Sequence, residues 1–293
     1  MSRSVIMSRK AAVVALMASV SLVACSTQEG TGTGIGALFG AAVGGALGGK
    51  KGALIGAAVG ALAGNRIGAY LDAKDRAELN KVTARNIERM KDGETVTWSN
   101  PDHGVSVDIT AQATDSMTRE VAFVRFKDVE APDALDIIGA PYEVSSNTAY
   151  VLSSPAIGGQ ILLELERGTG LWVIGAVPGK NWVYVERDGI AIGYVAATDL
   201  TAGTDDFALA SREPTMRQAI DLDDADDAAV SAHFAERGID LSALGDQQVV
   251  DRVSASSTCR DLKYELKSKD AEIEESLRAC KAGDGSWEII GDG

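Results

Sequence analysis

The sequence predicts an α+β fold, in which a transmembrane helical hairpin is followed by small all-β modules. Three observations support this prediction. Ten glycines stand at every fourth position from Gly32 to Gly68, among Ala, Leu, Ile and Val. After residue 94, apolar residues alternate with polar ones, as in half-buried strands. Residues 148–201 hold several short apolar runs separated by Gly, Pro, Asn and Asp, a pattern typical of small β-structures.

Residues 1–24 have the pattern of a lipoprotein signal peptide. An apolar run that ends in LVA directly before Cys25 follows three basic residues, Arg3, Arg9 and Lys10. We expect translation to start at Met1 or Met7, cleavage before Cys25, lipidation of that cysteine and a tether over residues 25–31. The alternative is a stray or buried thiol. No other cofactor is expected, and Ser26 is typical of lipoproteins sorted to the outer membrane.

The composition limits the partners of the mature chain. Loss of the signal peptide removes three basic residues and takes the formal charge from −14 to −17. Such an acidic chain, without interleaved basic and aromatic residues, is a poor nucleic-acid binder, so no nucleic-acid partner is expected. Two cysteines remain after Cys25. In an exported protein such a pair, Cys259 and Cys280, predicts one disulfide.

Residues 32–70 are predicted to form a two-helix membrane hairpin. A bilayer enforces helix, and a stripe of glycines lets another helix approach closely. Lys50 and Lys51, beside clustered glycines, mark the turn. The alternative is a disordered glycine-rich tether. The helix-packing residues would be Gly36, Gly40, Gly44, Gly48, Gly52, Gly56, Gly60 and Gly64.

Two crossings would return the chain to the side on which Cys25 is anchored. With an outer-membrane anchor, the rest of the protein would be periplasmic. The two lysines at the turn fit an inner-membrane arrangement equally well, because the positive-inside rule would place them in the cytoplasm. The sequence therefore leaves the choice of membrane to the weaker signal of Ser26.

Residues 71–93 are charged, with apolar residues at helical intervals, and are expected to form an exposed helical linker. Alternating apolar residues on both sides of the turn at residues 100–104 then predict two strands. From the lipobox and glycine zipper through Asp75-Arg76 to the segment from Trp98 to Asp102, the chain resembles the seventeen-kilodalton rickettsial surface antigen family of glycine-zipper lipoproteins.

The ending of that family is also matched, far downstream. Cys259-Arg260, Cys280 and residues 283–289 are similar to its closing β-hairpin and final strand. The resemblance implies a β-domain made of residues 94–130 and 255–290, with an insertion between them. The paired cysteines fit such a hairpin. A helix over residues 260–279 is the alternative, because Glu and Lys recur there at a spacing of four.

Residues 147–201 of the insertion resemble a bacterial SH3-like domain. The matching features, in order, are Ser154-Pro155, Arg167-Gly168-Thr169, Trp182 and Gly193-Tyr194-Val195. Such domains often bind cell-wall peptides or protein segments in an aromatic groove. The resemblance therefore implies a ligand groove formed by Trp182, Tyr184 and Tyr194. For each of the three, the alternative is a place in the core.

Residues 202–254 are predicted to form an acidic connector with a helix. Its aspartates lack the spacing of a calcium loop, and we expect them at a solvated helix start. The two histidines, His103 and His233, have no neighbouring cysteines or carboxylates at metal-ligand spacing, and no nucleophile motif occurs. We therefore expect no metal site, no catalytic residues and no enzymatic activity.

Two functions remain. The first is an outer-membrane lipoprotein that stabilises the envelope through self-associating glycine-zipper helices. The second is an SH3-like module that is tethered to the membrane and binds peptidoglycan or a periplasmic protein. The expected partners are membrane lipids, further copies of the chain or outer-membrane proteins, and, for the second function, peptidoglycan.

Overall fold

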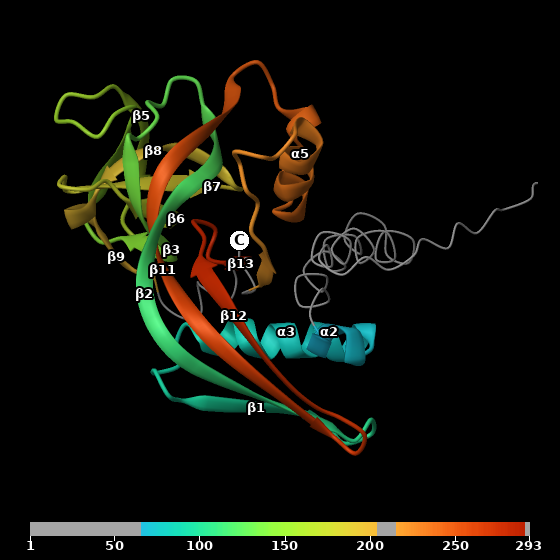
Figure 1. Ribbon diagram of the computed structural model, residues 1–293. Helices are drawn as coiled ribbons and strands as arrows, with labels where there is room; N and C mark the ends of the chain where they lie inside the picture. Colours follow the sequence, from blue (N-terminus) through green and yellow to red (C-terminus); the bar gives the residue numbers. More distant parts are fainter. Residues whose placement is uncertain (1–65, 204–214, 291–293) are drawn as a thin grey trace, which may run out of the picture. The chain divides into compact units, whose positions relative to one another are not determined.

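The computed structural model describes residues 66–203 and 215–290 (Figure 1). Of these residues, 52% lie in strands and 17% in helices, and all thirteen strands join one sheet. No helix in these two ranges has both the length and the apolar character needed to cross a bilayer. The predicted α+β class, with a transmembrane hairpin ahead of separate β-modules, is therefore wrong for the described chain, which is mainly β.

Two long antiparallel strands explain why the expected modules are joined. β2 (Val105–Phe126) and β11 (Gln248–Ser268) pair over their whole lengths, with one irregularity at Asp261/Leu262. Their paired ends at Phe126 and Gln248 mark the two ends of the inserted segment. Because β11 begins before residue 255 and pairs with β3, and β2 pairs with β8, the same sheet continues into the insertion.

One half of this sheet contains β1 (Thr95–Asn100), β12 (Glu272–Lys281), β13 (Trp287–Ile290) and the short β10 (Met216–Gln218). The order here is β1-β2-β11-β12-β13-β10, in which β10 and β13 run parallel. The predicted disulfide is confirmed: Cys259 and Cys280 are direct partners in the pairing of β11 with β12, and both are buried. The alternative helix over residues 260–279 is wrong, because most of these residues belong to the paired strands β11 and β12.

Two helices pack on this half of the sheet. α3 (Ala73–Ile87) buries a stripe that includes Leu79, Thr83 and Ile87 against strand residues such as Ile109 and Leu262. The prediction of an exposed linker is wrong, because the apolar stripe at helical spacing is covered by the sheet. The short α2 (Arg66–Tyr70), at the end of the predicted hairpin, buries Ile67 in the same core.

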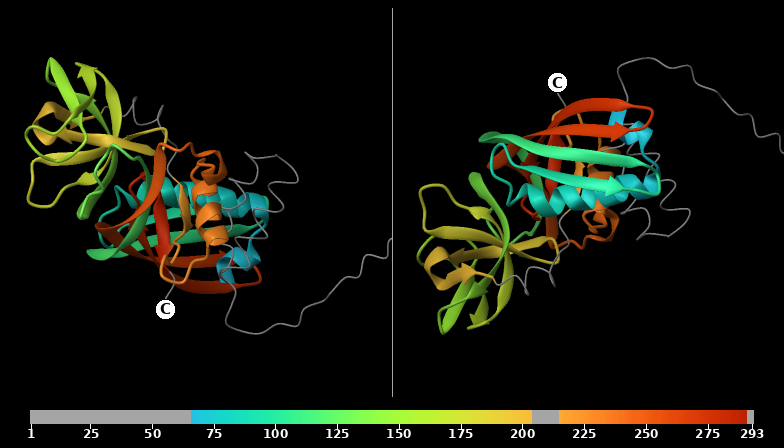
Figure 2. Two further views of the ribbon diagram at one scale, coloured as in Figure 1. Left: turned by 90° about the horizontal axis from the view of Figure 1, so that it is seen from above. Right: turned by 90° about the horizontal axis from the view of Figure 1, so that it is seen from below.

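The inserted segment forms the second group of strands (green to yellow in Figures 1 and 2). They are β3 (Ala134–Val144), β4 (Thr148–Leu152), β5 (Ile161–Glu166), β6 (Gly170–Ala176), β7 (Trp182–Arg187), β8 (Ile190–Ala196) and β9 (Leu200–Ala202). A 3-10 turn, η1 (Ala197–Asp199), precedes β9. Except for β3, these elements fall within residues 147–202.

Antiparallel pairing joins the strands in the order β3-β6-β7-β8-β4-β5, and β9 joins the other side of β3. The turn between β7 and β8 consists of Asp188 and Gly189, both with positive φ, as a two-residue hairpin of this twist requires. Valines from five of these strands fill one core, Val144, Val151, Val173, Val185 and Val195.

The expected acidic connector contains α5 (Asp227–Glu236) and the 3-10 turn η2 (Leu241–Ala243), as well as β10 and the start of β11. Asp226 caps α5 by accepting a hydrogen bond from the backbone N–H of Ala229, and Asp227 lies in the first turn. Phe234 of α5 is fully buried against Ala122 and Val124 of β2. The helix is thus part of the packed domain.

Candidate functional site

A carboxylate–imidazole cluster joins the start of α3 to the turn between β1 and β2. At the start of α3, Asp72 caps the helix by accepting hydrogen bonds from the backbone N–H groups of Lys74 and Asp75, each 2.8 Å long. On the turn, the Asn100 side chain accepts a hydrogen bond from the backbone N–H of Asp102. Two local motifs therefore fix the backbone on both sides.

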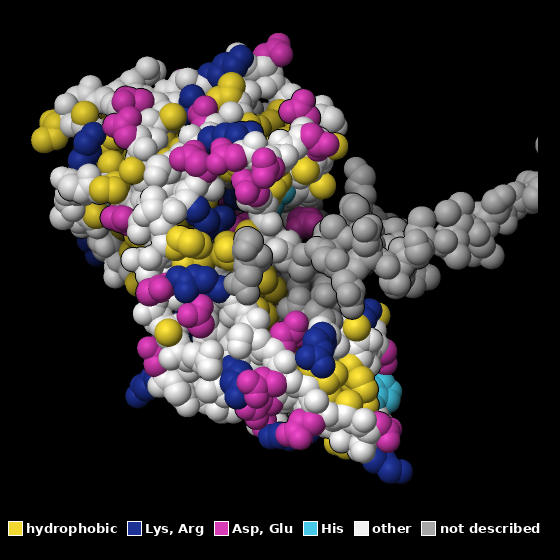
Figure 3. Space-filling view, in the orientation of Figure 1, with side chains coloured by type: hydrophobic (Ala, Val, Ile, Leu, Met, Phe, Trp, Pro, Cys, Tyr) yellow, Lys and Arg dark blue, Asp and Glu magenta, His cyan; other side chains and the backbone are white. Residues whose placement is uncertain are grey.

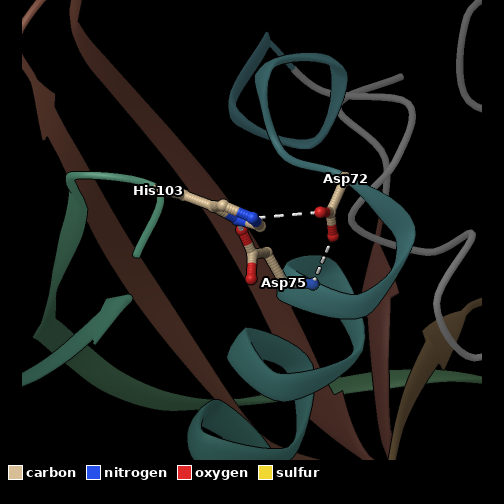
Figure 4. A group of neighbouring side chains, drawn as sticks. All are labelled: Asp72, Asp75 and His103. Carbon is tan, nitrogen blue, oxygen red and sulfur yellow. Dashed lines mark hydrogen bonds and ion pairs between the residues drawn. The ribbon is translucent and has the colours of Figure 1, made fainter. Parts of the chain in front are cut away.

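Between them lies Asp75, only 2% exposed. Its Oδ1 accepts a hydrogen bond of 2.7 Å from Asn100 Nδ2, and its Oδ2 lies 2.6 Å from His103 Nδ1. Asp72 Oδ2 lies 3.7 Å from the same nitrogen (Figure 4). We call Asp72, Asp75, Asn100 and His103 the turn clamp, because they tie the turn to the helix.

The carboxylates of the turn clamp shape its titration. The hydrogen bond with Asp75 and the charge of that carboxylate raise the pKa of His103. Hydrogen bonds from the backbone, with that of Asp75 as the largest contribution, lower the pKa of Asp72. The arrangement therefore favours an imidazolium held between two carboxylates.

The same side chains include a possible ligand set for a metal ion. One ligand atom each from Asp72, Asp75 and His103 lies within 4.8 Å of the others. A metal would take the imidazole nitrogen that now faces Asp75, so ion binding and the hydrogen-bonded clamp exclude each other. Since both Asp75 oxygens have hydrogen-bond partners, the geometry is that of a structural clamp.

The turn clamp was not predicted from the sequence. The sequence places His103 in a turn with no cysteine or carboxylate at metal-ligand spacing, because Asp72 and Asp75 lie some thirty residues earlier in the chain. The signal that could have revealed the clamp was the family resemblance, which singled out Asp75-Arg76 and residues 98–102. Arg76 is not part of the turn clamp. Its Nη1 donates hydrogen bonds to the carbonyl oxygens of Gly68 and Leu71, at the end of α2.

A second cluster of charges is buried between β10, β13, α5 and β2. Arg217 Nη1 lies 2.6 Å from Asp284, and its Nη2 lies 2.7 Å from Glu288. Glu288 also pairs with Arg119. Arg237 Nε lies 3.2 Å from Asp284. We call Arg119, Arg217, Arg237, Asp284 and Glu288 the buried charge network.

Opposing effects set the pKa values in this network. Burial alone would favour neutral Glu288, but Arg217 and Arg119 outweigh it and lower its pKa to about 2. His233, on α5, lies 3.8 Å from Glu288, yet burial dominates and lowers its pKa to about 4. The carboxylates are therefore charged at neutral pH while the imidazole is neutral. The ion pairs therefore hold β2, β10, β13 and the end of α5 together.

The predicted ligand groove is not formed. Tyr184 and Tyr194 are direct partners in the pairing of β7 with β8; they are at most 1% exposed, and their ring centroids lie 4.9 Å apart. The Tyr194 hydroxyl donates a hydrogen bond to the carbonyl oxygen of Glu130. Trp182 is half-buried beside the same core. The tyrosines therefore have the core role that was the alternative, because a small sheet of this kind needs large side chains inside it.

The remaining predicted site residues lie outside the described residues. They are the lipidation site Cys25 and the helix-packing glycines Gly36, Gly40, Gly44, Gly48, Gly52, Gly56, Gly60 and Gly64. Their lipidation and packing stay predictions.

Comparison with known proteins bears on this N-terminal part. A family model described as YMGG-like Gly-zipper matches residues 7–72. No curated protein and no solved structure matches the chain. The match supports the glycine-zipper part of the predicted resemblance, while the rickettsial antigen family and the SH3-like insertion stay predictions. The glycine-zipper match indicates a membrane-associated protein.

Proposed function

We propose that the chain is an outer-membrane lipoprotein with a structural role in the envelope, and that its glycine zipper brings copies of the protein together. The observation that carries this proposal is the glycine-zipper match at residues 7–72, within which glycine recurs at every fourth position from Gly32 to Gly68. A repeat of small residues at this spacing allows close approach of a second segment of the same kind. Lipidated Cys25 would supply the anchor.

The β-rich domain supports a structural role over an enzymatic one. The groups of the turn clamp and of the buried charge network take part in hydrogen bonds and ion pairs that join distant elements. The disulfide suits an oxidising compartment, such as the periplasm. The second function, binding of peptidoglycan or a periplasmic protein by an aromatic groove, loses its main argument, since Tyr184 and Tyr194 are core residues.

Replacement of Gly40, Gly44, Gly56 and Gly60 with Leu tests the glycine zipper. We expect the assembly seen after detergent-free native extraction to break down to smaller species and the envelope to become leaky to periplasmic proteins. The matched control replaces Ala42, Ala46 and Ala58 with Leu, outside the glycine register. Unchanged assembly size in the glycine variant, or an equal loss in the control, would contradict the proposal.

A second experiment tests the anchor. Incorporation of a palmitate analogue is expected in the natural chain and absent from Cys25→Ser. The natural chain should fractionate with outer-membrane markers. Fractionation with inner-membrane markers would leave the lipid anchor standing and refute the outer-membrane placement.

A further inference from the structure

Exposed apolar side chains gather on the hairpin of β4 and β5. Six large hydrophobic side chains are exposed among the described residues, and four of them lie between residues 150 and 163. These four are Tyr150 (43% exposed), Ile157 (100%), Ile161 (57%) and Leu163 (37%). We call them the apolar tip. Figure 3 shows hydrophobic side chains at the upper left, in the region of this hairpin.

The apolar tip lies mainly on the outer face and at the end of the hairpin. Ile161 is the strand partner of Leu152 and so shares a face with Tyr150. Leu163 is the partner of Val151 on the other face, which packs on the core through the fully buried Val151, so Leu163 is exposed only at the edge of that face. Ile157 stands in the loop between the strands. The exposed apolar side chains are therefore concentrated at the end of the hairpin, where a bilayer surface can reach them.

The loop that carries Ile157 is ordered by its own backbone. Ser153 N–H donates to the carbonyl oxygen of Gln160, and Gly159 N–H donates to that of Ala156. Gly158 adopts a positive φ of 93°, which the turn requires. The fully exposed Ile157 is therefore held at the tip by hydrogen bonds that also satisfy backbone groups which would be costly to leave unpaired in lipid.

Charge is sparse at the end of this hairpin. Residues 144–163 contain no Asp, Glu, Lys or Arg, although such residues make up 24% of the whole sequence. Glu164, the strand partner of Tyr150, is the first charged residue after this stretch. The chain as a whole is acidic, with a formal charge of −14. Electrostatic attraction to an anionic surface is therefore excluded as the driving force, and any binding by the tip would depend on apolar burial.

The size of the apolar tip favours a bilayer over a second copy. From their exposed fractions, the four side chains offer about 450 Å², roughly half of the 800 Å² that each partner contributes to a stable protein interface. A small apolar patch can still bind a bilayer when another part of the chain already holds the protein there, because the tether raises its effective concentration.

We propose that the apolar tip inserts into the headgroup–acyl boundary of a neutral phospholipid bilayer, as a second membrane contact beside the N-terminal anchor. The proposal rests on the membrane anchoring proposed above. It gives the inserted segment a role of its own, in which the β4–β5 hairpin holds the β-domain against a membrane surface.

The test uses the full chain in phosphatidylcholine vesicles. An environment-sensitive fluorophore is attached to Gln160→Cys, beside the tip, or to Lys180→Cys, an exposed turn residue between β6 and β7. Phospholipids with a nitroxide on the acyl chain quench fluorophores that enter the bilayer. We expect at least threefold stronger quenching at position 160 than at position 180, and no change in 1 M NaCl.

Substitutions test whether the side chain of Ile157 causes the quenching at position 160. Ile157→Asp should reduce quenching at position 160 to the level of position 180, whereas the conservative Ile157→Leu should retain it. Val250→Asp is the matched control, since Val250 is 38% exposed but lies on β11, outside the tip; it should leave quenching unchanged. Because Ile157 is fully exposed, its replacement is not expected to disturb folding.

Vesicle flotation separates the two proposals, because it reports the anchor and quenching reports the tip. Chains that float without preferential quenching at position 160 overturn the insertion of the tip and leave the anchor intact. Quenching that appears only at high protein density, with energy transfer between labelled copies, assigns the tip to a second copy and overturns the proposal. Chains that neither float nor show quenching overturn both.

Discussion

Asp75 and His103 connect the first turn of α3 with the β1–β2 turn through a hydrogen bond of 2.6 Å across 28 residues of sequence. The two partners differ in environment: the Asp75 side chain is 2% exposed, whereas that of His103 is 48% exposed. The buried carboxylate also accepts a hydrogen bond from Asn100. The turn is thus held to the helix through one shared acceptor, which makes Asp75 the central residue of the turn clamp.

Replacement of Asp75 with Ala should destabilise the domain by about 1–3 kcal/mol, because Asn100 and His103 both lose their acceptor. Urea unfolding followed by tryptophan fluorescence measures the change in the free energy of unfolding. Asp102→Ala, in the same turn but exposed, is the control and should change stability by less than about 0.5 kcal/mol. Equal effects of the two variants would show that the clamp does not stabilise the turn.

His103 should make stability depend on pH in a definite direction. Its pKa is raised in the folded state, so the folded protein holds the proton more tightly than the unfolded chain. The resulting stability is complete below the ordinary histidine pKa of 6.5 and is lost as the pH rises through the folded-state value. The difference in unfolding free energy between the natural protein and His103→Gln should therefore be larger at pH 6 than at pH 9. A difference that grows with pH would refute this account.

His233 should have the opposite effect. Burial lowers its pKa to about 4, so the unfolded chain binds the proton more tightly. Stability is complete above pH 6.5 and falls as the pH decreases toward 4, by up to about 3 kcal/mol for this group alone. His233→Gln should flatten the stability curve between pH 6.5 and pH 4. The flattening is measured relative to the natural protein, since carboxylates add their own acid dependence below pH 5. An unchanged slope in the variant would exclude His233 as its source.

Loss of one carboxylate from the buried charge network should be costly. Glu288→Gln leaves the guanidinium groups of Arg217 and Arg119 without their shared counter-charge. Removal of one partner of a buried ion pair typically destabilises by about 3–5 kcal/mol. Glu272→Gln, on the exposed side of β12, is the control and should have little effect. A loss of less than about 1 kcal/mol in Glu288→Gln would show that the network is not needed for stability.

The sequence was informative where the signal is local. Alternation predicted strands on both sides of the turn at residues 100–104, and the acidic run predicted a helix start that the structure places at Asp226 and Asp227. The disulfide followed from cysteine count. Each of these predictions needs only neighbouring residues or a single pair.

The features that the sequence did not predict, or predicted wrongly, depend on contacts between distant residues. The turn clamp joins residues 75 and 103, and the buried charge network joins Arg119, Arg217 and Glu288, whose meeting no local pattern reveals. The exposed linker was wrong because periodicity locates the apolar stripe of α3 but not the sheet that covers it. The aromatic groove was wrong for a related reason: the resemblance rests on short local motifs, which do not indicate that Tyr184 and Tyr194 face the core.

The disulfide should stabilise the domain, because it closes a loop between two paired strands. Cys259 and Cys280 are 21 residues apart, and both side chains are buried. A cross-link over a loop of this length restricts the unfolded chain and should contribute about 3 kcal/mol. The double variant Cys259→Ala, Cys280→Ala should therefore lower the urea midpoint without changing the fold, as judged by circular dichroism. Reduction of the natural protein should shift the midpoint by a similar amount and leave the double variant unaffected. A shift in the reduced protein without one in the double variant would mean that free thiols, and not loss of the cross-link, cause the destabilisation.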